Sequence, residues 1–184
     1  MTNVYIIHGY QADSQSHWFQ WLKSSLELEG HDVEVLDLPN SDEPVLEDWL
    51  AYMERHILDV NDETIFIAHS LGVVTTLRFL EKLPQDSLGK MAIVSGFNEK
   101  IEDLPKLDEF IDENMDYNSL RQRLSQVFAI AAKDDPTVPF EKTKRLSEHL
   151  KGKFYEFDEG GHFTEEDGFD SFLFLKQKVV KQFD

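Results

Sequence analysis

The chain has 184 residues, of which 41% are hydrophobic, and this is enough for one domain with a substantial core. It carries 36 acidic and 18 basic residues, so its formal net charge of −18 would repel nucleic acids and anionic membrane surfaces. It contains no cysteine, which excludes disulfides, thiol catalysis and thiolate metal sites.

Membrane and targeting segments are not predicted either. No apolar stretch approaches the length of a transmembrane helix, and the first residues lack the basic and apolar regions of a signal peptide. We therefore expect a cytoplasmic protein without a membrane partner. The sequence leaves the oligomeric state open, and a monomer is compatible with it.

Six short apolar runs alternate with helical patterns along the chain. The predicted strands lie near residues 4–8, 33–38, 64–69, 91–96, 126–132 and 153–157. This alternation is typical of a three-layer α/β/α fold built on a mostly parallel, doubly wound sheet. We expect a six-stranded sheet in a single domain over residues 1–184.

The first strand runs directly into the loop His8-Gly9-Tyr10-Gln11. Gly9 permits a turn that would expose the N–H of Tyr10, or that of Gln11, beyond the end of the strand. The ordinary alternative is that Gly9 is a plain turn glycine.

The third strand ends at a serine and is followed at once by a helical pattern. Ser70 has small residues two positions before it, Ala68, and two positions after it, Gly72. A sharp strand-to-helix turn needs small residues at these positions, because it brings the strand end and the helix start close together. Alanine departs from the usual G-x-S-x-G form, and a serine here could also be a simple helix N-cap.

The connection from 97 to 124, which follows the fourth strand, is longer than its neighbours. Its apolar residues lie among many acids and predict short amphipathic helices. We expect it to form a cap-like insertion over a small pocket, as either a packed surface helix or a mobile lid. Such a short cap favours small or extended substrates over long buried lipids.

The fifth strand leads into Lys133-Asp134-Asp135-Pro136. Asp135 is the favoured acid because the following proline pattern places it at the first position of a turn, where its side chain can point back over the strand ends. Asp134 remains an alternative, and either residue could simply form the turn. The sixth strand leads to Gly160-Gly161-His162, a flexible loop that presents a histidine, although a loop histidine is often merely solvated.

Together, Ser70, Asp135 and His162 match the chain order and settings of a hydrolytic triad. His162 would take the proton of the Ser70 hydroxyl as it attacks an acyl carbon, and Asp135 would orient the imidazole. The backbone N–H groups of Leu71 and Tyr10 are the predicted oxyanion donors, with Leu71 at a helix N-terminus.

With these residues, nearly the whole chain resembles the α/β-hydrolases, and within them the small serine hydrolases related to retinoblastoma-binding protein nine. The resemblance implies that the two N-terminal antiparallel strands of the larger superfamily are missing here. It also rests on several shorter motifs: His8-Gly9, His17-Trp18-x-x-Trp21-Leu22, Leu38-Pro39-Asn40, Pro44, Trp49, Asp134-Asp135-Pro136-x-Val138-Pro139 and Gly160-Gly161-His162-Phe163.

The predicted function is hydrolysis of a small ester, thioester or amide, with a small acyl compound as the partner molecule and no cofactor. Metal-dependent hydrolysis is disfavoured because no His-x-x-x-His or Glu-x-x-His pair lies near His8 or His69. A serine at the turn disfavours an aspartate-nucleophile enzyme. The alternative function is a protein-binding module that keeps a hydrolase fold with an idle site.

Overall fold

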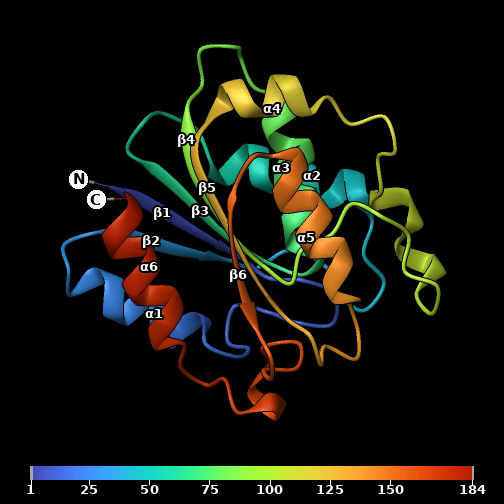
Figure 1. The fold of residues 1–184 in the computed structure, drawn as a ribbon. Coiled ribbons are helices and arrows are strands. Elements are labelled where there is room, and N and C mark those ends of the chain that lie inside the picture. Colours follow the sequence, from blue (N-terminus) through green and yellow to red (C-terminus); the bar gives the residue numbers. More distant parts are fainter. Residues whose placement is uncertain (1, 184) are drawn as a thin grey trace.

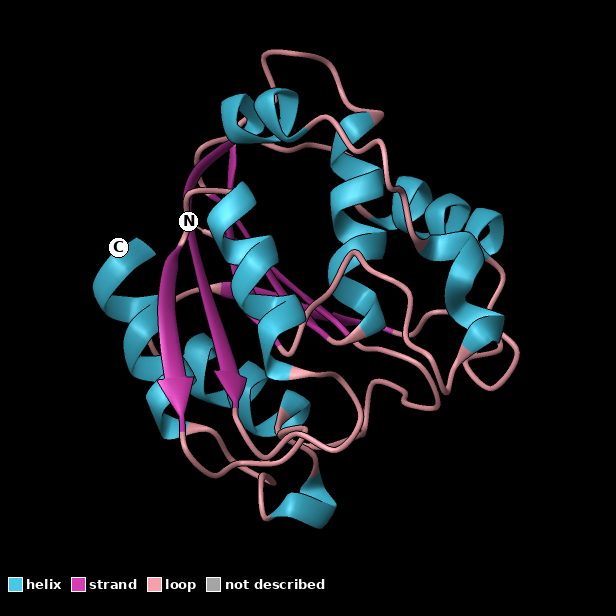
Figure 2. Cartoon of the chain, turned by 45° about the vertical axis from the view of Figure 1, so that its right-hand side comes forward, coloured by secondary structure: helices cyan, strands magenta, loops and turns pink. Residues whose placement is uncertain are grey.

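The computed structural model describes residues 2–183 and contains a six-stranded parallel sheet with helices on both faces (Figures 1 and 2). The strand order is β2-β1-β3-β4-β5-β6. The strands are β1 Asn3–Ile7, β2 Asp32–Leu36, β3 Thr64–His69, β4 Gly89–Val94, β5 Leu124–Ala132 and β6 Lys153–Phe157.

Two groups of helices cover the two faces of the sheet. The helices are α1 Phe19–Glu27, α2 Leu46–His56, α3 Leu71–Glu81, α4 Tyr117–Arg123, α5 Phe140–His149 and α6 Leu173–Phe183, with short 3-10 helices η1 Pro105–Phe110 and η2 Glu165–Asp167. Helices α1 and α6 pack on one face and the other α-helices on the opposite face, so each face has its own apolar core (Figure 1). Among the described residues, no helix has the length and apolar character needed to cross a membrane.

The sheet alternates its side chains between the two cores. Ile65 and Ile67 of β3 point to the α1 and α6 side, whereas Phe66 and Ala68 point to the other side. Because both faces are covered, every residue of β3 is buried, which explains its continuous apolar sequence.

The direction of chain winding reverses between β1 and β3. From β1 the chain first adds β2 on one side, then returns to add β3 on the other side and continues outward to β6. Open parallel sheets bind ligands beyond the carboxyl ends of their strands at such a switch point. The loop at Gly9 and the turn at Ser70 follow these two strands.

The predicted architecture is confirmed, with shifts of one or two residues at strand ends. The largest shift is in the fourth strand, predicted at 91–96 and observed at Gly89–Val94. It ends early because Ser95 turns away from the strand with a φ of 50° while its N–H still bonds the Ile130 carbonyl at 3.0 Å. The sheet is parallel throughout.

Candidate active site

Ser70 lies at the apex of a tight turn between β3 and α3. Its φ of 55° is unusual for a residue other than glycine, and its N–H bonds the Val94 carbonyl at 2.9 Å. Gly72 lets the turn sit against β1: a Cβ there would be 2.4 Å from the His8 carbonyl oxygen. This close approach is the physical reason for the small residue after the serine. Strained backbone of this kind is concentrated at functional sites.

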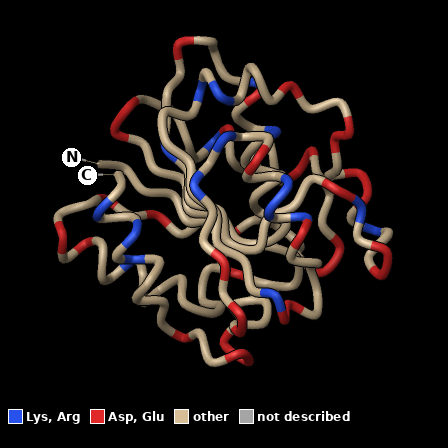
Figure 3. Tube along the Cα trace, viewed as in Figure 1, with Lys and Arg blue, Asp and Glu red and all other residues tan. Residues whose placement is uncertain are grey.

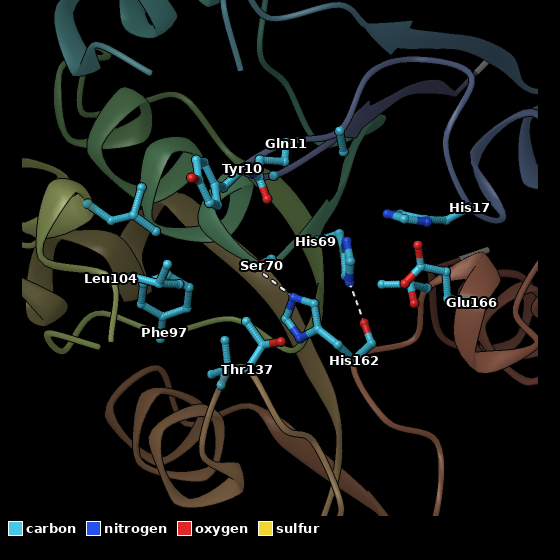
Figure 4. Close-up of a pocket in the computed structure, with 15 residues that line it drawn as sticks. Tyr10, Gln11, His17, His69, Ser70, Phe97, Leu104, Thr137, His162 and Glu166 are labelled. Atoms are coloured by element: carbon cyan, nitrogen blue, oxygen red, sulfur yellow. Dashed lines mark hydrogen bonds between the residues drawn. The ribbon is translucent and has the colours of Figure 1, made fainter. Parts of the chain in front are cut away.

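The structure brings Ser70, His162 and Asp135 into one chain of hydrogen bonds. Figure 4 marks the hydrogen bond between His162 and Ser70, in which His162 Nε2 lies 2.9 Å from Ser70 Oγ. On the other side of the ring, His162 Nδ1 lies 2.8 Å from Asp135 Oδ2. The Asp135 carboxylate can only accept, so the ring proton belongs on Nδ1 and the Nε2 lone pair faces the serine hydroxyl. The histidine is therefore set to accept a proton from Ser70.

The Asp135 carboxylate is held firmly in this position. Its side chain is only 1% exposed, and its second oxygen accepts the N–H groups of Thr137 and Val138 at 2.8 and 3.0 Å. These turn hydrogen bonds come from the Asp-Pro-Thr-Val segment that favoured Asp135 in the sequence.

The neighbouring Asp134 has a different partner. Its Oδ1 accepts the N–H groups of Gly160 and Gly161 at 3.0 and 2.9 Å, in the loop that carries His162. Asp135 therefore bonds the imidazole of His162, whereas Asp134 bonds the backbone of the loop that carries this imidazole.

The predicted oxyanion donors lie on two segments that meet at Ser70. A Cβ on Gly9 would be 3.0 Å from the Ser70 Cβ and 3.2 Å from the Leu71 nitrogen, so the loop after β1 packs directly on the turn. The Gln11 N–H is already engaged by the Ser41 carbonyl at 2.9 Å. This leaves the Tyr10 N–H as the candidate donor from the loop.

Buried His8 orients that loop. The Leu38 N–H donates to His8 Nε2 at 2.9 Å, so the ring proton lies on Nδ1 and donates to the Gly9 carbonyl, also at 2.9 Å. The carbonyl and N–H of one peptide group point in opposite directions, so this bond turns the Tyr10 N–H away from His8. Burial lowers the pKa of His8 and keeps the ring neutral.

A cavity of about 310 Å³ opens beside Ser70. One part of its wall is apolar, formed by Phe97, Leu104, Leu107 and Val138, and another part is polar, formed by Gln11, His17, Thr164 and Glu166. Figure 4 shows Phe97 and Leu104 on one side of Ser70, with His17 and Glu166 on the other. Within residues 2–183, no group of three or more histidine and acidic side chains is arranged to hold a metal ion.

The sequence predicted only the 97–124 connection as part of the pocket, because the named wall residues come from four separate loops. Of the polar members, Gln11 was considered only as the alternative oxyanion donor and His17 only as part of the His17-Trp18 motif, and neither was assigned to substrate binding. The predicted long connection after β4 supplies much of the apolar part through Phe97, Leu104 and Leu107.

The sheet topology and the serine turn at its switch point define an α/β hydrolase. The chain belongs to the serine hydrolase family, whose model matches residues 4–180. It is therefore a hydrolase, and the resemblance drawn from its sequence is confirmed.

Individual relatives agree with this membership. The ydeN gene product of Bacillus subtilis (strain 168) is 41% identical over 181 residues, covering 98% of this chain and 95% of the relative. Its crystal structure matches with a TM-score of 0.94, over 100% of this chain and 98% of that chain at 38% identity. Serine hydrolase RBBP9 of Rattus norvegicus is 23% identical over 166 residues, covering 88% of this chain and 87% of the relative.

Proposed function

We propose that this hydrolase cleaves a small ester, thioester or amide through an acyl-enzyme intermediate on Ser70. The observation that carries the proposal is the continuous hydrogen-bond chain from Ser70 through His162 to Asp135. A serine hydroxyl becomes an effective nucleophile when an oriented base removes its proton during attack.

In the first half-reaction, Ser70 Oγ attacks the acyl carbon and its proton passes to His162 Nε2. Asp135 stabilises the resulting imidazolium and holds its tautomer. His162 then gives the proton to the departing alcohol, thiol or amine, which leaves the acyl group on Ser70. In the second half, water attacks this ester, again with His162 as base, and releases the carboxylic acid.

The tetrahedral intermediates carry a negative oxygen, which the N–H groups of Leu71 and Tyr10 would stabilise. Leu71 is the first residue of α3, an eleven-residue helix whose dipole also favours negative charge at that end. Neutral His8 supports this role, because a fixed Gly9 peptide needs no reorganisation as the charge develops.

The cavity favours a small acyl group. Its volume of about 310 Å³ lies at the lower end of the range for small-molecule pockets, about 300–1,000 Å³. We assign the acyl chain to the apolar wall and the leaving group to the polar wall. Residues 97–124 form the roof of the acyl side in this assignment, as a packed cap within a single domain.

The test is intact mass after incubation with a fluorophosphonate, which phosphonylates activated serines. We expect one label per wild-type chain, no label in Ser70→Ala, and labelling slowed by about a thousandfold or more in His162→Ala. Ser95→Ala is the matched control: Ser95 also follows a strand with positive φ, but its hydroxyl has no hydrogen-bond partner among the described residues. Folded wild-type protein that stays unlabelled would favour a binding module with an idle site.

A further inference from the structure

We propose that His69, together with His17 and Trp18, positions the catalytic histidine by clamping the backbone of its loop through three ring nitrogens. The proposal rests on the function proposed above, and it gives a role to the His17-Trp18 motif. His69 is the central member because it bonds the peptide group of His162 itself.

The three contacts fall on neighbouring residues of the loop. His69 Nε2 donates to the His162 carbonyl at 2.7 Å, a bond visible in Figure 4. The Trp18 indole N–H donates to the next carbonyl, that of Phe163, at 3.0 Å. The N–H of Glu165 then donates to His17 Nδ1 at 3.1 Å.

The rings of the clamp also contact one another. The centroid of the His69 ring lies 5.5 Å from that of His17, 5.9 Å from that of Trp18 and 4.8 Å from that of His162. His69 ends β3 beside the nucleophile, whereas His17 and Trp18 precede α1. The clamp therefore ties the loop after β6 to two rigid elements of the sheet and its helical layer.

The loop needs such support because its backbone is strained. Phe163 has a φ of 53°, which is unfavourable for a bulky side chain. Conformations of this kind persist only where the surroundings over-determine them. The Asp167 carboxylate adds a bond at 2.9 Å to the His162 N–H, so both sides of this residue's backbone are held.

The central position of the clamp favours an uncharged imidazole at His69. Complete burial lowers the pKa of His69 well below 6.5, and the positive charges that His162 and His17 can carry lower it further. A neutral donor holds the carbonyl without adding a charge beside the imidazolium that forms on His162 during the reaction. The other His69 nitrogen, Nδ1, is buried with no hydrogen-bond partner among the described residues, a cost that a purely structural position would avoid.

Two amide substitutions test the clamp. The side-chain nitrogen of glutamine reaches the place of His69 Nε2, whereas that of asparagine reaches only the place of Nδ1. We expect His69→Asn to lower both the fluorophosphonate labelling rate and kcat for 4-nitrophenyl butyrate by about tenfold to a hundredfold, with KM unchanged. His69→Gln should recover most of both rates, and hydrogen exchange of residues 162–165 should rise only in His69→Asn.

The outcomes separate this proposal from the function on which it rests. An unlabelled wild type refutes the activated serine before any variant is compared. If the wild type is labelled, equal rates in His69→Asn and His69→Gln, or a loss confined to KM, would overturn the clamp. Should His69→Asn fail to fold, His69→Phe keeps the ring volume without a donor and carries the same expectation.

Discussion

At the scale of single residues, the two adjacent aspartates differ in what they touch. Asp135 bonds the imidazole of His162, whereas Asp134 bonds the backbone N–H groups of Gly160 and Gly161. Asp135→Asn replaces an acceptor by an amide that can force the wrong tautomer. We expect it to lower kcat by about a thousandfold to ten-thousandfold in an ester assay.

Asp134→Asn is the matched control for this prediction. Its amide oxygen can still accept the two loop N–H groups, so kcat should fall by less than about tenfold. Equal losses in both variants would contradict the assignment of Asp135 as the acid that serves His162.

At the scale of elements, the connection between β4 and α4 supplies much of the apolar wall of the cavity, where we propose that the acyl group binds. Leu104, just before η1, is half-buried and lines the apolar wall, whereas Lys106 and Glu109 fasten the segment to Glu43 and to the Leu46 N–H. These attachments favour a packed roof over a mobile lid.

Leu104→Ala should therefore lengthen the acyl chain that the enzyme prefers. Each additional methylene that the widened pocket buries is worth about 0.8 kcal/mol, or about fourfold in kcat/KM. The measurement is kcat/KM over a series of 4-nitrophenyl esters from acetate to octanoate. Leu58→Ala serves as the control because Leu58 is 85% exposed and does not line the cavity, and an unchanged profile in Leu104→Ala would refute the assigned roof.

At the scale of the whole molecule, acidic residues are distributed along the entire chain trace (Figure 3). The histidines near the site are the groups through which the free energy of unfolding depends on pH in mild acid. Burial is the main cause that lowers the pKa of His8, His17 and His69 below 6.5 in the folded protein. The unfolded chain, with histidine pKa values near 6.5, binds more protons below that pH.

The free energy of unfolding should accordingly be highest above pH 6.5 and should fall as the pH drops below it, because protonation of these histidines favours the unfolded chain. Each of the three histidines contributes up to about 1.4 kcal/mol per pH unit until its folded pKa is reached. Urea denaturation at pH 7.5 and pH 5.5 measures the difference, and most carboxylates stay ionised over this interval. The free energy of unfolding should change less with pH in His69→Gln, because this variant lacks one of the three titrating histidines. An equal free energy of unfolding at both pH values would contradict the prediction.

The sequence by itself determined the strand and helix order, the serine turn, and Ser70 and His162 as candidate site residues, and it limited the acid to Asp135, which it favoured, or Asp134. These features depend on local periodicity and turn chemistry, which neighbouring residues encode. The steric role of Gly72 could also be predicted from the sequence, since a tight strand-to-helix turn requires a small residue at that position.

Only the tertiary structure decided, for two pairs of neighbouring groups, which member contacts the site: Asp134 or Asp135, and the N–H of Tyr10 or of Gln11. It placed Asp135 on the imidazole and Asp134 on the loop, engaged the Gln11 N–H elsewhere, and joined the His17-Trp18 motif to the His162 loop. Adjacent residues share the same local signals, and their partners lie up to 148 positions away in the chain. Such contacts arise only when the carboxyl ends of separate parallel strands come together at one edge of the sheet.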